Sequence, residues 1–136
     1  MGFPETVAIV GAGNMGAGIA QKIAMEGFTV LLADMDLERA TVGKGRIAAS
    51  LEQAVARRVL SAPQAEATLA RVTPVGGLEG LANADLVIEA VFENLLVKKE
   101  LLRNLDAICK PECILASNTL VDDDVGCCCC CCRSVP

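Results

Sequence analysis

The sequence predicts an α/β domain built on a doubly wound parallel sheet with an inserted helical hairpin. Short apolar runs alternate along the chain with longer segments of helical periodicity, which is the pattern of parallel strands joined by crossover helices. The apolar residues are mostly alanine, valine, leucine and isoleucine, and Phe3, Phe28 and Phe92 are the only aromatic residues. Strands of this composition suit a sheet that helices cover on both faces. A chain of 136 residues supports one such core, so we expect one folded domain.

The first strand and the loop after it carry the most informative motif of the chain. An apolar strand over residues 6–10 runs into Gly11-Ala12-Gly13-Asn14-Met15-Gly16 and then into an amphipathic helix. Gly11 permits the tight turn off the strand, Gly13 leaves room for a pyrophosphate, and Gly16 lets the helix pack closely on the sheet. The amino end of the helix offers N–H groups and a positive dipole end to phosphates. The alternative is a glycine-rich turn of no function.

The second strand, over residues 28–33, leads to Asp34, which decides the expected ligand. A carboxylate at the tip of this strand is placed to accept hydrogen bonds from the adenosine ribose hydroxyls of a dinucleotide, and it repels the additional phosphate of NADP. Met35 and Asp36 follow, so the local charge stays negative, and Arg39 is expected to project from the next helix. The sequence therefore predicts a Rossmann-type domain that binds NAD.

Two consecutive helices are expected between the second and third strands. The first runs from about residue 37 to residue 59. The second starts from a Ser61 cap, tolerates Pro63 in its first turn and ends near residue 71. This hairpin lies outside the minimal strand–helix–strand plan, and it either carries specificity or forms a solvated helical arm.

The rest of the domain continues the alternation. We expect a short strand over residues 72–75, a Gly76-Gly77 turn and a short helix over residues 78–82. A strand over residues 85–91, a helix over residues 95–108 and a last strand over residues 113–117 follow. Ligands of such sheets bind beyond the carboxyl ends of the strands. One crevice is therefore expected to contain Gly11, Asp34, Phe92-Glu93 and Asn118-Thr119.

Helical periodicity also predicts which side chains are buried. In the first helix, Met15 and Met25 are expected to fill the core beside apolar neighbours at helical spacing. In the helix over residues 95–108, Lys98, Lys99 and Glu100 are expected on the solvent face.

Composition and charge exclude several kinds of partner. The net charge of −5 gives no electrostatic reason to expect nucleic acid or acidic lipid. No apolar run approaches membrane-spanning length, and the N-terminus enters the first strand too soon for a signal peptide, so we expect a soluble cytoplasmic protein. The chain has no histidine and no tyrosine, and so it lacks the usual proton-exchanging groups of alcohol–ketone chemistry.

The end of the chain breaks the pattern of the domain. We expect the folded domain to cover residues 1–119, and residues 120–136 to form an irregular low-complexity tail. This tail contains six consecutive cysteines, Cys127 to Cys132, and no histidine or second cysteine pair completes a metal shell. No metal site is expected, with a functional thiol cluster as the alternative. Cys109 and Cys113 are expected to be reduced.

Three segments together resemble the NAD-binding domain of the 3-hydroxyacyl-CoA dehydrogenases. They are Val7 to Ala20 around the glycine loop, Val87 to Asn94, and Leu115 to Thr119. The likeness is colinear over about residues 5–119 and includes the helical hairpin. These motifs in combination are much more specific than the glycine loop alone.

The resemblance implies a role for individual residues. It implies that NAD contacts the glycine loop, the acid after the second strand and four residues further along: Gly11, Gly13, Asn14, Met15, Gly16, Asp34, Ala90, Glu93, Lys98 and Asn118. It also implies that the CoA thioester is bound partly by Ser50 and Arg57 on the hairpin. A solvated helix face is the alternative for these two residues.

The family's activity is the NAD-dependent oxidation of an L-3-hydroxyacyl-CoA to the 3-oxoacyl-CoA in fatty-acid metabolism and β-oxidation. Leu120 stands where the family has a serine near the reacting carbonyl. The family's histidine–glutamate pair, distal asparagine and helical dimerisation domain have no counterpart in the 136 residues. We therefore expect the cofactor-binding half of such an enzyme, inactive alone and dimeric only with its catalytic domain. Two alternatives are a stand-alone NAD-binding or interaction module and the cofactor half of a related dehydrogenase of free hydroxy acids.

Overall fold

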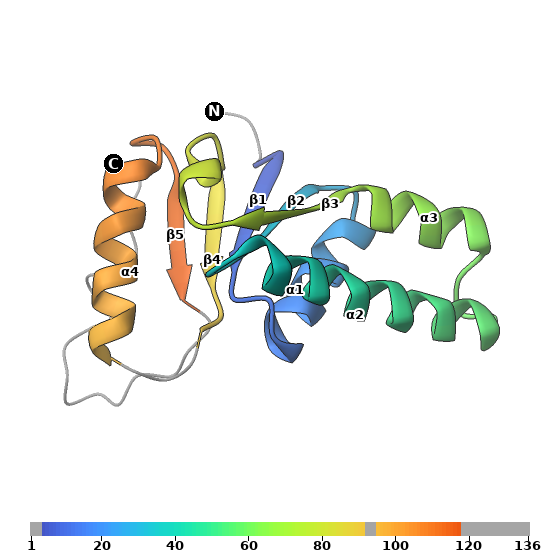
Figure 1. Ribbon diagram of the computed structural model, residues 1–136. Helices are drawn as coiled ribbons and strands as arrows, with labels where there is room; N and C mark the ends of the chain where they lie inside the picture. Colours follow the sequence, from blue (N-terminus) through green and yellow to red (C-terminus); the bar gives the residue numbers. More distant parts are fainter. Residues whose placement is uncertain (1–3, 92–94, 118–136) are drawn as a thin grey trace.

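The computed structural model describes residues 4–91 and 95–117, which form a sheet of five parallel strands with its connecting helices. The strands are β1 (Thr6–Val10), β2 (Thr29–Asp34), β3 (Val72–Gly76), β4 (Leu86–Glu89) and β5 (Ile114–Ser117). They lie in the order β3-β2-β1-β4-β5 (Figure 1). The chain thus winds from the central β1 to one edge and then crosses back to the other. The predicted doubly wound sheet is confirmed, with a topological switch point between β1 and β4.

The helices are α1 (Asn14–Met25), α2 (Leu37–Ala56), α3 (Ala62–Ala70), the short 3-10 helix η1 (Glu79–Leu81) and α4 (Leu95–Ile108). Helix α4 lies beside β5 at one end of the sheet, whereas α2 and α3 run side by side and extend beyond the opposite edge (Figure 1). The inserted hairpin is therefore confirmed.

Local sequence signals set the ends of the hairpin helices. The Asp36 carboxylate accepts a hydrogen bond of 2.8 Å from the Arg39 N–H and caps α2. Ser61 and Gln64 form a reciprocal capping box at the start of α3, as the serine signal predicts. Helix α2 ends at Ala56 rather than at residue 59, because Arg58 takes a positive φ of 60° and turns the chain.

The core consists of two clusters, one on each face of the sheet. Successive strand residues point to opposite faces. Val7 and Ile9 pack with small residues of α1 and with Ile47 and Leu51 of α2. Ala8 and Val10 pack toward Leu105 of α4 on the other face. The strands are therefore buried on both faces of the sheet, which explains why their sequences are uniformly apolar.

Two predictions about buried side chains are wrong. Met15 and Met25 are 62 % and 38 % exposed, since small residues occupy the buried face of α1: Gly16, Ala17, Ala20 and Ala24. Lys98, predicted on the solvent face of α4, is only 5 % exposed. Its partner is Glu89, at the end of β4. Cys109 and Cys113 are buried thiols, as predicted.

Asp85 connects three segments at the amino edge of the sheet. Its Oδ2 accepts hydrogen bonds from the Glu5 N–H at 2.9 Å and the Thr6 N–H at 3.0 Å. Its Oδ1 pairs with the Lys110 ammonium in the turn before β5. The hydrogen bond from Lys110, followed by those from the two backbone amides, lowers the pKa of Asp85 from 3.8 to about 2. The same contact raises the pKa of Lys110.

Candidate nucleotide-binding site

Two glycines shape the turn between β1 and α1. Gly11 has a φ of +107°, and its N–H donates to the Ala33 carbonyl at 2.8 Å. A Cβ at Gly11 would lie 2.8 Å from the Ala90 carbonyl oxygen, and a Cβ at Gly16 would lie 1.6 Å from the Gly11 carbonyl oxygen. Both positions therefore need glycine because backbone atoms fill the space. The turn folds back on the first turn of α1, as the motif predicts.

Gly13 serves a different purpose from these two glycines. It is the N-cap residue of α1, and no side chain caps the helix there. A Cβ at Gly13 would meet no atom of the described residues within 4 Å. Gly13 thus leaves its own side-chain space open at the amino end of a 12-residue helix, whose backbone N–H groups and dipole favour an anion. This geometry fits a pyrophosphate.

Asp34 ties the end of β2 to the glycine loop. Its Oδ2 accepts a hydrogen bond from the Ala12 N–H at 2.8 Å, and its Oδ1 accepts one from the Met35 N–H at 2.6 Å. Each carboxylate oxygen can accept a second hydrogen bond. The carboxylate is thereby fixed beside the loop with acceptor capacity left for ribose hydroxyls.

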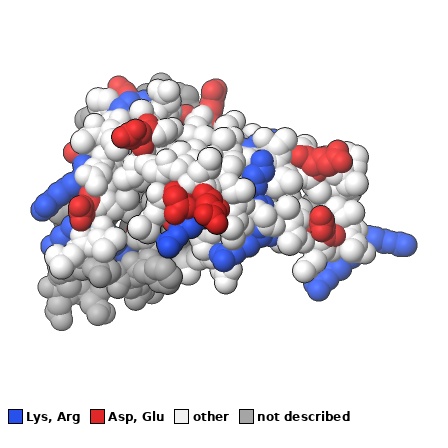
Figure 2. Space-filling view, viewed as in Figure 1, with Lys and Arg blue, Asp and Glu red and all other residues white. Residues whose placement is uncertain are grey.

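A groove of about 450 Å³ opens beside Asp34, between the glycine loop and the start of α2. Acidic and basic side chains lie next to each other near the middle of this face in Figure 2. The lining residues are Ala12, Gly13, Asp34, Asp36, Glu38, Arg39, Val42 and Arg46. The predicted negative local charge is therefore partly offset, since two arginines of α2 line the same groove.

Gly43 explains how α2 comes so close to the loop. A Cβ at this position would lie 2.6 Å from the Ala12 Cβ and 2.8 Å from the Ala12 carbonyl oxygen. Glycine inside a helix costs about 0.5–1 kcal/mol relative to alanine, and the close approach explains its presence here. The approach lets the Arg46 Nη1 donate to the Ala12 carbonyl at 3.4 Å. The sequence interpretation missed Arg46, although a glycine in mid-helix was the available signal.

A buried ion pair lies at the carboxyl end of β4. Glu89 is 1 % exposed, and its Oε1 lies 3.8 Å from the Lys98 Nζ and 3.3 Å from the Val91 N–H, which donates to it. Next to Glu89, the Ala90 N–H donates to the Val10 carbonyl at 2.8 Å, which places Ala90 against the glycine turn. Sequence interpretation assigned Lys98 but missed Glu89, whose signal is an acidic residue inside an apolar strand.

The structure thus brings part of the predicted cofactor set together at the carboxyl edge of the sheet: Gly11, Gly13, Gly16, Asp34 and Ala90. Asn14 and Met15 begin α1 at the same place. Lys98 is buried behind the β4 end. Glu93 and Asn118 lie outside the described residues.

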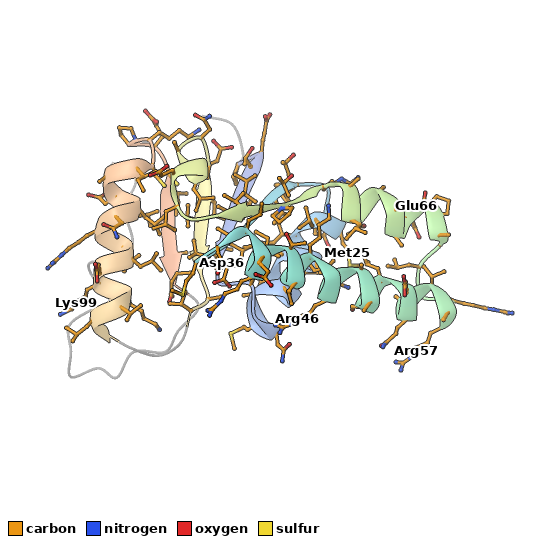
Figure 3. All side chains as sticks on the ribbon, in the orientation of Figure 1. Met25, Asp36, Arg46, Arg57, Glu66 and Lys99 are labelled. Atoms are coloured by element: carbon orange, nitrogen blue, oxygen red, sulfur yellow. The ribbon has the colours of Figure 1, made fainter. Side chains whose placement is uncertain are left out.

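The two residues predicted for CoA are not part of this groove. Ser50 and Arg57 are exposed on the hairpin. Figure 3 shows Arg57 at the far end of α2, away from Asp36 and Arg46. Eleven residues of helix from Arg46 to Arg57 span roughly 16 Å. A ligand that touches both the groove and Arg57 must therefore be long.

Comparison with known proteins gives the family. The family model for the 3-hydroxyacyl-CoA dehydrogenase, NAD binding domain, matches residues 6–121. The chain belongs to this family. It is an NAD-binding domain, and the alternative of a functionless glycine turn is excluded.

Individual relatives agree with this assignment. The chain is 46 % identical over 115 residues to the 3-hydroxyadipyl-CoA dehydrogenase of Escherichia coli K12, covering 85 % of this chain and 24 % of the relative. It is 38 % identical over 115 residues to a 3-hydroxybutyryl-CoA dehydrogenase of Bradyrhizobium diazoefficiens, covering 85 % of this chain and 39 % of the relative. The chain therefore spans between about a quarter and two fifths of the length of these relatives.

Solved structures show the same fold. The 3-hydroxybutyryl-CoA dehydrogenase of E. coli K12 superposes with a TM-score of 0.82 at 45 % identity, over 86 % of this chain and 25 % of that one. FadB2 of M. tuberculosis gives a TM-score of 0.83 at 37 % identity, over 87 % and 42 % of the two chains. Within the described ranges, no helix combines the length and apolar character needed to cross a membrane.

Proposed function

We propose that the chain binds NAD along the carboxyl edge of the sheet and is the cofactor-binding part of a dehydrogenase that oxidises a 3-hydroxyacyl-CoA to the 3-oxoacyl-CoA. The observation that best supports this proposal is the position of the Asp34 carboxylate. It accepts a hydrogen bond from the Ala12 N–H at 2.8 Å, beside the Gly13 N-cap of α1. The ribose acceptor at the end of β2 is thus bound to Ala12, one residue before the proposed phosphate site at Gly13. NAD supplies the hydride acceptor, and the protein supplies its position.

Each part of the edge has its own task in this proposal. Gly11 and Gly16 keep the turn tight, and Gly13 with the first N–H groups of α1, from Asn14 and Met15, receives the pyrophosphate. Asp34 accepts hydrogen bonds from the adenosine ribose. Ala90 brings only a methyl group to the end of β4 beside the glycine turn. The family resemblance extends the cofactor path to Glu93, Lys98 and Asn118.

The substrate class comes from the relatives and from the hairpin. The similar proteins are named for 3-hydroxyadipyl-CoA and 3-hydroxybutyryl-CoA, so an acyl-CoA thioester is the proposed substrate. Ser50 offers a hydroxyl and Arg57 a guanidinium on the exposed hairpin. A guanidinium binds phosphate through paired N–H donors, which makes Arg57 the proposed contact for a CoA phosphate.

Titration with NADH, followed by the cofactor's own fluorescence because the chain has no tryptophan, tests the cofactor assignment. We expect tighter binding of NADH than of NADPH. Asp34→Ala is expected to weaken NADH binding by about 1–3 kcal/mol, because it removes charge-assisted hydrogen bonds. Glu66→Ala on exposed α3 is the matched control and leaves the affinity unchanged. Equal binding of NADH by the unaltered chain and a folded Gly13→Asp variant would contradict the proposed groove.

The hairpin assignment needs a separate measurement. CoA binding by calorimetry is expected to weaken in Arg57→Ala and to stay unchanged in Arg58→Ala, which removes the same charge from the adjoining exposed position. Equal losses in the two variants would indicate general charge attraction instead of a contact made by Arg57.

A further inference from the structure

Arg46 holds a position in the groove that neither the motif nor the family assignment explains. Arg39, Val42 and Arg46 lie on one face of α2, at helical spacing, and all line the groove. Arg46 donates to the Ala12 carbonyl at 3.4 Å, and Asp34 accepts from the Ala12 N–H at 2.8 Å. A guanidinium and a carboxylate therefore hold the same residue of the loop from its two sides.

The two arginines of the groove differ in how their charge is compensated. Arg39 lies 3.7 Å from the Asp36 carboxylate and also donates to the Met35 sulfur at 3.5 Å. Arg46 forms no ion pair within the described ranges, and its hydrogen-bond partner is a neutral carbonyl. Arg46 therefore brings an uncompensated positive charge to the groove, next to the carboxylate that selects the cofactor.

An additional phosphate on the adenosine ribose would meet both groups. Its negative charge is repelled by Asp34 and attracted by Arg46, whose planar donors match phosphate oxygens. The charged lining residues are Asp34, Asp36, Glu38, Arg39 and Arg46. Three carboxylates against two guanidiniums leave the groove one charge negative, and neutralising Asp34 balances it.

We propose that Arg46 is a latent ligand for a ribose 2′-phosphate, and that the Asp34 carboxylate opposes this binding and keeps the groove selective for NAD over NADP. The inference rests on the proposed function, because it takes the adenosine ribose to lie against Asp34. Arg46 is thereby a specificity-determining residue, and its ligand class is a 2′-phosphorylated adenine nucleotide. Arg39 is less available for this role because Asp36 already compensates its charge.

A double-variant experiment tests the assignment. Asp34→Asn removes the negative charge and keeps a side-chain oxygen that can accept the Ala12 N–H. We expect NADPH affinity to rise at least about 10-fold in this variant, the gain of one charge-assisted hydrogen bond. Adding Arg46→Met is expected to remove that gain. Adding Lys44→Met, which removes the same charge from the same helix outside the groove lining, is expected to leave it in place.

A second measurement restricts the comparison to the adenosine end of the cofactor. It determines by calorimetry how tightly the same proteins bind adenosine 2′,5′-bisphosphate and 5′-AMP. The proposal is supported if Asp34→Asn raises the affinity for the bisphosphate but not for 5′-AMP, and if adding Arg46→Met removes that rise. A gain that survives Arg46→Met, or that Lys44→Met removes equally, overturns it. Asp34→Ser replaces Asp34→Asn if the asparagine variant does not fold by circular dichroism, with the same expected pattern.

Failure of the proposed function gives a different result from failure of this inference. If the unaltered chain binds neither NADH nor 5′-AMP, the nucleotide groove itself is wrong. If the unaltered chain binds NADH but a folded Asp34 variant gains nothing for NADPH, the groove stands and the role of Arg46 is refuted.

Discussion

Asp85→Asn is expected to destabilise the fold in a pH-dependent way. The Asp85 carboxylate joins the start of β1, the start of β4 and the turn before β5 through the Glu5 and Thr6 N–H groups and the Lys110 ammonium. Asparagine can keep one acceptor for the backbone amides. It cannot keep the charge that pairs with Lys110.

The magnitude follows from the pKa of Asp85, which is lowered from 3.8 to about 2, mainly by the hydrogen bond from Lys110. A shift of this size corresponds to about 2.5 kcal/mol at 1.36 kcal/mol per pKa unit. The Asp85 and Lys110 side chains are 29 % and 38 % exposed, so solvent screens the pair. We therefore expect about 1–2 kcal/mol of stability from the carboxylate at neutral pH.

The sign of the pH dependence follows from the direction of each shift. The folded-state pKa of Asp85 is depressed, so its contribution is complete above the unfolded value of 3.8 and is lost as the pH falls through about 2. About half of it remains at pH 3 by the same linkage. The raised pKa of Lys110 acts in the opposite direction: its contribution is present below 10.5 and is lost as the pH rises further.

Urea unfolding followed by far-UV circular dichroism tests this reasoning, since the chain has no tryptophan or tyrosine to report by fluorescence. The loss of unfolding free energy in Asp85→Asn is expected to be about 1–2 kcal/mol at pH 7 and about half of that at pH 3. Glu66→Gln, an exposed position on α3, is the control and is expected to change nothing. An equal loss at pH 7 and pH 3 would refute the role of the charge.

The remaining predictions concern the carboxyl edge of the sheet. Gly16→Ala is expected to abolish NADH binding and lower the thermal midpoint, because its Cβ would lie 1.6 Å from the Gly11 carbonyl oxygen; unchanged NADH titration would contradict this. Glu89→Gln leaves Lys98 buried without its carboxylate and is expected to cost about 3–5 kcal/mol in urea unfolding. The double variant with Lys98→Met is expected to recover at least half of that loss, and a double variant as unstable as the single one would show that the pair is not the cause.

The sequence predicted the architecture well because its signals there are local. Each strand is a short apolar run, and the capping residues Asp36 and Ser61 stand directly before the helices they start. The glycine motif predicted the turn after β1, since the positive φ of Gly11 and the close approach of Gly16 to the Gly11 carbonyl both arise within the turn itself. Such signals need no knowledge of which distant segments meet.

The missed charged residues of the site depend on contacts between distant segments. Lys98 was expected on the solvent face because it is charged and has charged neighbours. Its helical phase nevertheless matches that of buried Leu102 and Leu105, at spacings of four and seven residues. The buried Glu89, on a different element, compensates the charge of the lysine there. The sequence pattern thus contained the helical position of Lys98, whereas its partner Glu89 is evident only from the tertiary structure.

Ala12 connects the shape of the loop to cofactor selection. Its N–H is held by Asp34, its carbonyl by Arg46, and its Cβ meets α2 where Gly43 leaves room. The residue that we propose to select the cofactor is therefore also a support of the loop proposed to receive the phosphates. Removing the Asp34 side chain consequently changes two properties at once, which is why Asp34→Ala tests binding whereas Asp34→Asn tests selectivity. If the two variants weakened NADH equally, the charge would account for the whole effect, and the support of the loop by Asp34 would contribute nothing to binding.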